Sequence, residues 1–272
     1  MDEGLKYENY LQALSLDRPK SSRIDLIRRY WNVNIHDIEI TKYPVGAKDF
    51  FDELESHRSK KLEYLAGIVG LEPYGGKKLL DVGCGVGVDL VRFAKRGAIV
   101  TGIDLADRAI QLARKNLELH GVKGELLVMD GEEMSFKENS FDVVFVHGVL
   151  GYTNDPMRMT NEVHRVLKPG GEAILMVYHR NSWLFFGAEL FGVKLGREDA
   201  PVFMTHSMDD FKKMLMNFSH LNMFTVRFPV KTQIHKGIKG KVFNYLFVPA
   251  FNLVPKSMVN SIGAHLIAKV IK

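Results

Sequence analysis

The sequence predicts an α/β fold in which a parallel sheet is covered by helices on both faces. From residue 77 to residue 179, short apolar runs alternate with segments whose apolar residues recur at helical spacing. Such alternation is typical of parallel sheets, because the crossover from one strand to the next is usually a helix. The chain has 272 residues, 46% of them hydrophobic, which is enough to bury one large core.

The bounds of these elements follow from the pattern and from its stop signals. Gly97 and Gly121 end the first two helices. The third helix combines an Asn154 or Asp155 cap and Pro156 in its first turn with a Pro-Gly-Gly stop. The predicted strands are residues 77–82, 98–105, 124–130, 140–149 and 172–179, and the predicted helices are residues 88–97, 107–121 and 154–171.

The N-terminal segment has a different character. Residues 1–75 lack strand alternation and predict a helical cap, with helices over 23–31 and 49–70. The intervening loop contains Pro44 and Gly46.

The C-terminal segment completes the sheet. Ser207 and Asp210 form a capping-box pattern that opens a helix over residues 207–218. Residues 221–228 and 264–272 predict two more strands. The connection between these strands is too long for a simple loop, which indicates structure or function of its own.

Charge is distributed unevenly along the chain. The net charge is +5, yet no Asp or Glu follows Asp210. This basic tail favours an anionic partner such as an acidic substrate, a phospholipid surface or nucleic acid, unless the lysines form only a solvated face. The basic residues after Asp210 are Lys212, Lys213, Arg227, Lys231, Lys236, Lys239, Lys241, Lys256, Lys269 and Lys272.

Cysteine content and hydropathy predict a cytoplasmic protein. Cys84 is the single cysteine, which excludes an intramolecular disulfide and argues against a cysteine zinc site. No metal is expected. The acidic start MDEGLKYENY has no apolar core, so no signal peptide is expected. No run reaches the roughly 18 apolar residues of a spanning helix.

Three successive strand ends predict a nucleoside site. The turn after the first strand has glycines at 83, 85 and 87, a spacing that differs from the dinucleotide fingerprint, and no Gly-Lys-Ser/Thr is present to make a P-loop. Glycines there let backbone N–H groups approach a ligand. Asp104 ends the next strand, where an acid binds ribose hydroxyls. Asp130 ends the third strand and can accept a hydrogen bond from an adenine amine.

With these features in place, the sequence resembles the class I S-adenosylmethionine-dependent methyltransferases, in particular the ubiquinone-biosynthesis-like small-molecule branch. The resemblance covers roughly residues 50–180. It implies a Rossmann-like seven-stranded sheet of order 3-2-1-4-5-7-6 with strand 7 antiparallel. The segments that carry the resemblance are LLDVGCGVGVDL, VTGIDLADRAIQLARKN, VMDGEEMSFKENSFDVVFVHGVL and VLKPGGEAILMVYH.

The expected domain organisation follows from this resemblance. Residues 1–75 would form the helical cap and residues 76–272 the methyltransferase domain. Residues 180–206 and 229–258 would be insertions on the substrate side, the second of them between the last two strands.

The resemblance also implies how the cofactor S-adenosyl-L-methionine is held. Asp104 would bind its ribose, Asp130 its adenine, Asp81 its amino group and Arg58 its carboxylate. The residues expected at the cofactor are Arg58, Asp81, Gly83, Cys84, Gly85, Gly87, Asp104, Leu105, Asp130, Gly131, Glu132 and His147.

Methyl transfer would be an in-line displacement on a small acceptor, in which the protein mainly aligns the reactants and excludes water. His147 and Tyr152 are the candidate bases. Many relatives have two histidines where this chain has Gly151 and Tyr152, so a base typical of the family is absent there. The residues expected at the substrate pocket are Tyr30, Trp31, Tyr43, His179, Trp183 and His206.

The insertion over residues 229–258 interleaves lysines with aromatic residues. This composition predicts a lid over a hydrophobic or anionic small molecule, or a segment that contacts an anionic membrane. Two other classes stay open: an RNA or protein methyltransferase, and a non-catalytic protein that binds S-adenosylmethionine or lipid. No RNA-binding appendage or Asn-Pro-Pro-Tyr-type motif is present, so no nucleic-acid partner is expected.

Overall fold

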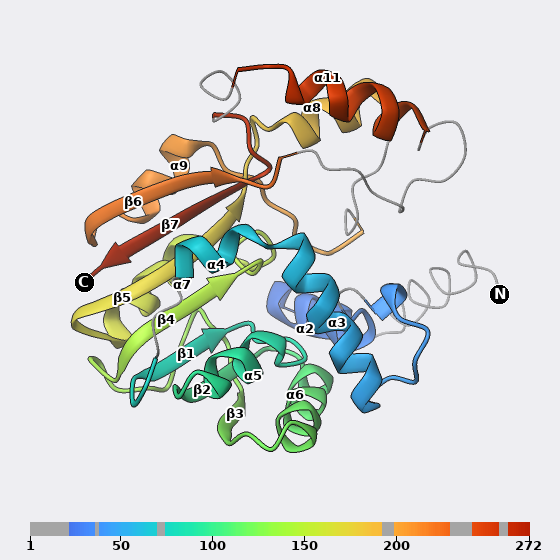
Figure 1. The fold of residues 1–272 in the computed structure, drawn as a ribbon. Helices are drawn as coiled ribbons and strands as arrows, with labels where there is room; N and C mark the ends of the chain where they lie inside the picture. Colours follow the sequence, from blue (N-terminus) through green and yellow to red (C-terminus); the bar gives the residue numbers. More distant parts are fainter. Residues whose placement is uncertain (1–21, 36–37, 70–73, 192–198, 229–240, 256–260) are drawn as a thin grey trace.

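The computed structural model describes residues 22–35, 38–69, 74–191, 199–228, 241–255 and 261–272. These residues form a seven-stranded sheet of order β3-β2-β1-β4-β5-β7-β6, which confirms the predicted fold class and strand order (Figure 1). The strands are β1 (Lys78–Val82), β2 (Ile99–Asp104), β3 (Gly124–Val128), β4 (Phe141–His147), β5 (Leu167–Tyr178), β6 (Ser219–Val226) and β7 (His265–Ile271).

Strand direction brings the site residues to one edge of the sheet. Strands β1 to β5 pair in parallel, so their carboxyl ends lie together. Strand β7 is antiparallel to both β5 and β6. Its first residue, His265, therefore pairs with Tyr178, the last residue of β5, at that same edge.

Helices cover both faces of the sheet. On one face, α5 (Val88–Lys95) and α6 (Asp107–Leu119) bury Phe93 and Leu117 against β1, β2 and β4. On the other face, α7 (Pro156–Val166) and α9 (Met208–Met214) pack against the alternate residues of the same strands. Because successive strand residues point to opposite faces, each strand contributes to both cores.

The predicted helix over residues 49–70 is wrong as a single element. It is divided into α3 (Lys48–Lys61) and α4 (Tyr64–Val69). Phe50, Phe51 and Leu54 of α3 pack against Val86 and Val88, which flank the end of the glycine turn. The break has a physical reason, because Leu62 and Leu65 pack instead into the core of the sheet and the chain must turn to reach it.

The N-terminal helix α2 (Arg23–Val33) begins at a capping box formed by Ser22 and Asp25. It contacts α6, and η1 (Ile38–Ile40) lies between α2 and α3 along the chain. Together α2, α3 and α4 form the described part of the region that precedes β1 (Figure 1).

The predicted end of the third crossover helix at residue 171 is also wrong. Asp155 caps α7 as expected, but the helix ends at Val166 and Leu167 already pairs with Phe141 in the sheet. Pro169 disfavours a helical conformation for the residue before it, so the helix cannot continue. The register then shifts, and regular pairing resumes at Glu172.

Three helical segments that contain aromatic side chains pack against one another. Helix α8 (Trp183–Phe191) lies beside the π-helix η2 (Phe243–Phe247) and α11 (Val248–Asn252) (Figure 1). The Trp183 ring contacts the rings of Phe243, Phe247 and Phe251 at 6.0–6.4 Å between centroids. Residues 229–240 and 256–258 of the predicted lid lie outside the described residues. Among the residues that the structure describes, no helix is long and apolar enough to cross a membrane.

Candidate functional site

The glycine turn is built for close approach of a ligand. Gly83, Gly85 and Gly87 have φ angles of 69°, 53° and 77°, in the left-handed region that favours glycine. The N–H groups of Gly83 and Cys84 donate to the Ile103 carbonyl at 2.8 and 3.0 Å, which ties the turn to β2. A Cβ atom on Gly85 would have no heavy atom within 4 Å. The space beside the Gly85 backbone is therefore open.

Asp104 lies at the end of β2 beside this turn. Its Oδ2 atom accepts from the Gly85 N–H and its Oδ1 atom from the Ala106 N–H, both at 2.9 Å. Burial raises the pKa of Asp104, and the hydrogen bonds from Ala106, Gly85 and Leu105 oppose that rise. Each carboxylate oxygen keeps further lone-pair capacity. The carboxylate thus fits the two hydroxyls of a ribose while it also fixes the turn.

Asp130 follows β3 and forms the third member of the set. Its Oδ1 atom accepts from the Glu132 N–H at 2.9 Å, and burial raises its pKa. The next residue, Gly131, is tightly packed, because a Cβ atom there would lie 2.8 Å from Met159 Cε and 2.9 Å from Val82 Cγ1. Glycine at 131 therefore lets the backbone beside Asp130 lie directly against Met159 and Val82.

Glu132, predicted as a cofactor residue, directs its carboxylate to the loop before α7. One oxygen, Oε1, accepts from the Thr153 hydroxyl and from the N–H groups of Asn154 (2.6 Å) and Asp155 (2.8 Å). The side chain is buried. The carboxylate therefore holds the loop that follows β4.

Replacing Glu132 with alanine is expected to lower the free energy of unfolding by about 2–4 kcal/mol, because the buried Thr153 hydroxyl and two partly buried backbone N–H groups lose their acceptor. Urea denaturation measures the change. Glu133→Ala is the matched control, since the adjacent carboxylate is exposed and pairs only with the exposed Arg158, and it should change stability by less than about 0.5 kcal/mol. Equal losses in the two variants would contradict the buried role of Glu132.

Arg58 and Asp81 belong to a buried charge cluster. The Arg58 guanidinium donates to Asp89 of α5 through Nε at 2.8 Å and through Nη2, and Nη2 lies 3.4 Å from His147 Nδ1. Burial favours the neutral form of Asp89, but Arg58 more than offsets this and lowers its pKa. The pKa of Asp81 is raised well above its usual value by burial and then by the Asp89 charge. The cluster thus lies at the methionyl end of the predicted site, with Arg58 already engaged by a carboxylate of the protein.

Comparisons with known proteins show the family to which the chain belongs. Residues 80–175 match the family model described as a methyltransferase domain. The chain is 36% identical over 172 residues to a ubiquinone biosynthesis O-methyltransferase from Alkalilimnicola ehrlichii, covering 57% of this chain and 67% of that protein. It is 31% identical over 189 residues to the enzyme of the same name from Pseudomonas aeruginosa, covering 67% of this chain and 78% of that protein. The chain belongs to the class I S-adenosylmethionine-dependent methyltransferases.

Solved structures share the fold of this methyltransferase. A possible histamine N-methyltransferase from Thermotoga maritima has a TM-score of 0.58 at 19% identity, covering 90% of this chain and 99% of that chain. Magnesium protoporphyrin IX methyltransferase from Synechocystis, solved with S-adenosylhomocysteine, has a TM-score of 0.59 at 16% identity, covering 91% and 99%. S-adenosyl-L-methionine is the cofactor of the methyltransferase, and it supplies an activated methyl group.

An aromatic wall stands beside the ends of β4 and β5. We use this name for Trp31, Tyr152, Tyr178 and Phe203. The ring of Tyr152 lies 5.1 Å from Trp31, 5.7 Å from Tyr178 and 5.4 Å from Phe203, between centroids. The structure thus brings together Trp31 and Tyr152 from the predicted sets, and the Tyr30 ring contacts the Trp31 ring edge to face at 5.1 Å between centroids. Tyr178 was not predicted.

The wall explains why Gly151 replaces the histidine of many relatives. A Cβ atom at position 151 would lie 2.8 Å from Tyr178 Cδ2 and 3.0 Å from the Met204 carbonyl oxygen. The Tyr178 ring therefore occupies the space that a side chain at 151 would need.

The rings of the other predicted pocket residues are not part of the wall, although the His206 N–H donates to the Tyr178 carbonyl at 2.9 Å. Tyr43 is 41% exposed. His179 and His206 are buried, and their backbones pair as a single β-bridge after β5. Burial lowers the pKa of both imidazoles. Trp183 packs with α11, and its Nε1 donates to the Arg227 carbonyl at 2.9 Å.

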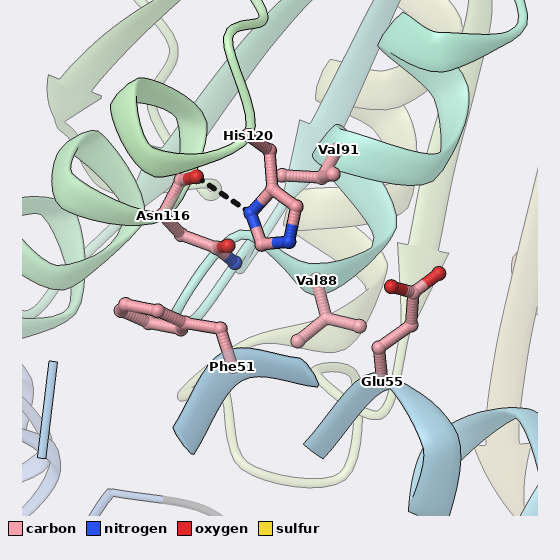
Figure 2. Close-up of a pocket in the computed structure, with 6 residues that line it drawn as sticks. All are labelled: Phe51, Glu55, Val88, Val91, Asn116 and His120. Carbon is pink, nitrogen blue, oxygen red and sulfur yellow. Dashed lines mark hydrogen bonds between the residues drawn. The ribbon is translucent and has the colours of Figure 1, made fainter. Parts of the chain in front are cut away.

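A crevice lies between α3, α5 and α6. Figure 2 shows the His120 ring, whose Nδ1 donates to the Asn116 carbonyl at 2.9 Å. None of the residues predicted for the cofactor or the acceptor lines this crevice. The crevice is lined by Phe51, Glu55, Val88, Val91, Asn116 and His120.

Proposed function

We propose that the methyltransferase transfers a methyl group to an oxygen atom of a small, hydrophobic or anionic acceptor. The observation that carries this proposal is the aromatic wall, which adjoins the strand ends that hold the cofactor residues. Aromatic side chains offer large apolar contact area to a planar molecule. Two relatives are O-methyltransferases by name, which supports oxygen as the accepting atom.

The proposed chemistry is an in-line displacement aligned by the protein. The wall excludes water from the acceptor side, and His147 or Tyr152 would remove a proton from the acceptor. A guanidinium only donates, so Arg58 faces the Nδ1 lone pair of neutral His147, and His147 would take the proton of the acceptor at Nδ1 only when this 3.4 Å contact opens. Tyr152 is buried within the wall, close to where the acceptor would bind.

A metabolite screen tests the proposal. The methyltransferase is incubated with an extract of small metabolites and S-adenosylmethionine that carries an isotope-labelled methyl group, and mass spectrometry detects labelled products. We expect label in a hydrophobic or anionic small molecule, with release of S-adenosylhomocysteine. Label confined to RNA or protein would contradict it, and cofactor binding without any product would support the non-catalytic alternative.

His147→Ala tests the proposed base in the same assay. Loss of a general base is expected to lower turnover by about 100-fold. The affinity for S-adenosylhomocysteine should stay close to that of wild type, because the expected contact of His147 with the cofactor is made by its backbone carbonyl, which alanine keeps. His164→Ala serves as the control, since that ring contacts Phe218 away from the strand ends. Turnover of His147→Ala at the wild-type rate would remove His147 from the chemistry.

We also propose peripheral contact with an anionic membrane through the segment predicted over residues 229–258 and the adjoining α8. Support comes from an apolar ridge, by which we mean Phe186, Tyr245, Leu246 and Leu253, whose exposed fractions are 67–85%. Ten Lys or Arg and no acid occur after Asp210, which gives the complementary charge. Such a contact would let a hydrophobic acceptor reach the site from lipid.

Vesicle co-sedimentation is the measurement. The protein should bind vesicles of phosphatidylcholine and phosphatidylglycerol, but not phosphatidylcholine alone, and the binding should weaken with added salt. Leu246→Glu with Leu253→Glu should abolish it. Met216→Glu is the control, because Met216 is 75% exposed outside the ridge. Equal binding of the ridge variant and the control would refute the contact.

A further inference from the structure

Three polar side chains from distant segments form a hydrogen-bonded chain beside the aromatic wall. His265, the first residue of β7, lies between Tyr64 of α4 and Arg227, which follows β6. Its Nδ1 atom is 2.8 Å from Tyr64 Oη, and its Nε2 atom is 2.9 Å from Arg227 Nη1. The His265 ring is 2% exposed and contacts the Tyr178 ring of the wall at 5.4 Å. None of these three residues has a role in the site as described above.

The direction of each hydrogen bond follows from donor chemistry. The guanidinium of Arg227 only donates, so His265 Nε2 must accept. Burial, and then the Arg227 charge, lower the pKa of His265 well below its usual value, so the imidazole is neutral and carries its proton on Nδ1. Nδ1–H therefore donates to Tyr64 Oη. The hydroxyl hydrogen of Tyr64 then has to point to a further acceptor, and the phenol keeps it because burial raises the pKa of Tyr64.

The positive charge of Arg227 beside Tyr64 and His265 is not neutralised by a carboxylate within the described ranges. Asp89 is engaged by Arg58 and Arg92. Within the described ranges, no carboxylate lies within ion-pair distance of Arg227. The guanidinium of Arg227 donates one of its five N–H groups to His265, which leaves four for other acceptors. A half-buried cation with unspent donors is stabilised by an anion that accepts them.

The backbone at Arg227 is held in a costly conformation. Its φ angle is 62°, in the left-handed region that is unfavourable for an arginine. Two donors fix it there, the Trp183 Nε1–H at 2.9 Å and the Ala264 N–H at 3.2 Å, both to the Arg227 carbonyl. Strain of this kind persists where surrounding structure imposes it, and it concentrates at binding sites.

We propose that Arg227 and Tyr64 form a binding site for a carboxylate, with His265 as the positioning residue that orients the Tyr64 hydroxyl. His265 contacts Tyr178 of the aromatic wall. The carboxylate therefore belongs to the acceptor, whose ring would pack on the wall. This rests on the proposed function and narrows its acceptor class to aromatic or similarly planar carboxylic acids. The other source of the same chemistry is the methionyl carboxylate of the cofactor.

Binding measurements on the intact protein test the site without a known acceptor. Benzoate is titrated into protein saturated with S-adenosylhomocysteine, with benzamide as its neutral isostere, and ligand-observed NMR gives the affinities. Wild type should bind benzoate more tightly than benzamide. Arg227→Gln should weaken benzoate binding by about tenfold or more, and Arg227→Lys should restore part of it.

Tyr64→Phe removes only the hydroxyl, so it serves where Arg227→Gln does not fold. It should weaken benzoate binding severalfold, whereas Tyr74→Phe, a buried tyrosine that packs on Phe93, should have no effect. His265→Gln should weaken benzoate binding at least as much as Tyr64→Phe, because His265 contacts both Tyr64 and Arg227. The two losses should be less than additive in the double variant, because part of the effect of His265 passes through the Tyr64 hydroxyl.

The cofactor source is distinguished by a second titration. If the carboxylate is methionyl, Arg227→Gln weakens S-adenosylhomocysteine binding while 5′-methylthioadenosine, which lacks the amino-acid part, binds as before. Unchanged affinities for both benzoate and S-adenosylhomocysteine in Arg227→Gln and Tyr64→Phe would overturn the site. Failure of wild type to bind S-adenosylhomocysteine would instead count against the cofactor assignment, so the two failures are distinct.

Discussion

Replacing Gly83 with alanine is expected to lower the free energy of unfolding by about 2–5 kcal/mol and to abolish measurable binding of S-adenosylhomocysteine. Two effects add. The φ angle of 69° is unfavourable for any residue with a Cβ atom, and that atom would lie 2.2 Å from Val149 Cγ2. Val149 packs against a core of the sheet and has little freedom to move away. Chemical denaturation and calorimetric titration with S-adenosylhomocysteine measure the two consequences.

Gly121 supplies the matched control for the backbone effect. Its φ angle is 65°, and a Cβ atom there would meet nothing within 4 Å. Gly121→Ala should therefore cost only the left-handed conformation, about 1–2 kcal/mol, and leave cofactor affinity unchanged. The difference between the two glycines isolates the collision, and Gly83→Ala combined with Val149→Ala should relieve part of it. Equal stability of Gly83→Ala and Gly121→Ala would show that Val149 does not restrict the turn.

Asp104→Ala is expected to weaken S-adenosylhomocysteine binding by at least about 1–2 kcal/mol, because a ribose loses a charged hydrogen-bond acceptor. The measured loss of binding free energy should exceed the contribution of the ribose contact alone. The same carboxylate accepts the N–H groups of Gly85 and Ala106, so its removal also frees the turn that must approach the cofactor. Calorimetry gives the affinity, and circular dichroism reports whether the variant is folded.

Asp107→Ala controls for the loss of an aspartate near the same loop. Asp107 begins α6, is exposed and lies three residues beyond Asp104. Its removal should leave cofactor affinity within about twofold, since an exposed charge contributes little. A folded Asp104→Ala protein with wild-type affinity would rule out ribose binding by this carboxylate.

Strand ends were the part of the site that the sequence could predict. Asp81, Asp104 and Asp130 lie at or just beyond the ends of successive apolar runs, and parallel strands bring such ends to one edge. The structure confirms the strand order on which this depends. Their roles toward the cofactor stay predictions, because strand order places them but does not identify their ligands.

Contacts between remote segments could not be predicted. Arg58 lies 31 residues from Asp89, and Tyr64 lies 201 residues from His265. No periodicity relates such pairs, since their approach depends on how α3 and α4 pack on the finished sheet. Glu132 shows the converse difficulty. It directly follows Asp130-Gly131, yet its carboxylate turns to the loop after β4, which is 21–23 residues farther along the chain.

The position of β7 in the sheet makes one part of the sheet able to unfold separately from the rest. Strand β6 has a single neighbour, β7, which joins the sheet after it along the chain. Detachment of β7 therefore strips β6 of its sheet hydrogen bonds and removes His265, while β1 to β4 keep all of their partners. The strands that carry the predicted cofactor residues are thus able to outlast the edge that carries the proposed acceptor site in partial unfolding, as separate cooperative units do. In folding, the same order delays assembly of the acceptor side until the long connection after β6 has closed.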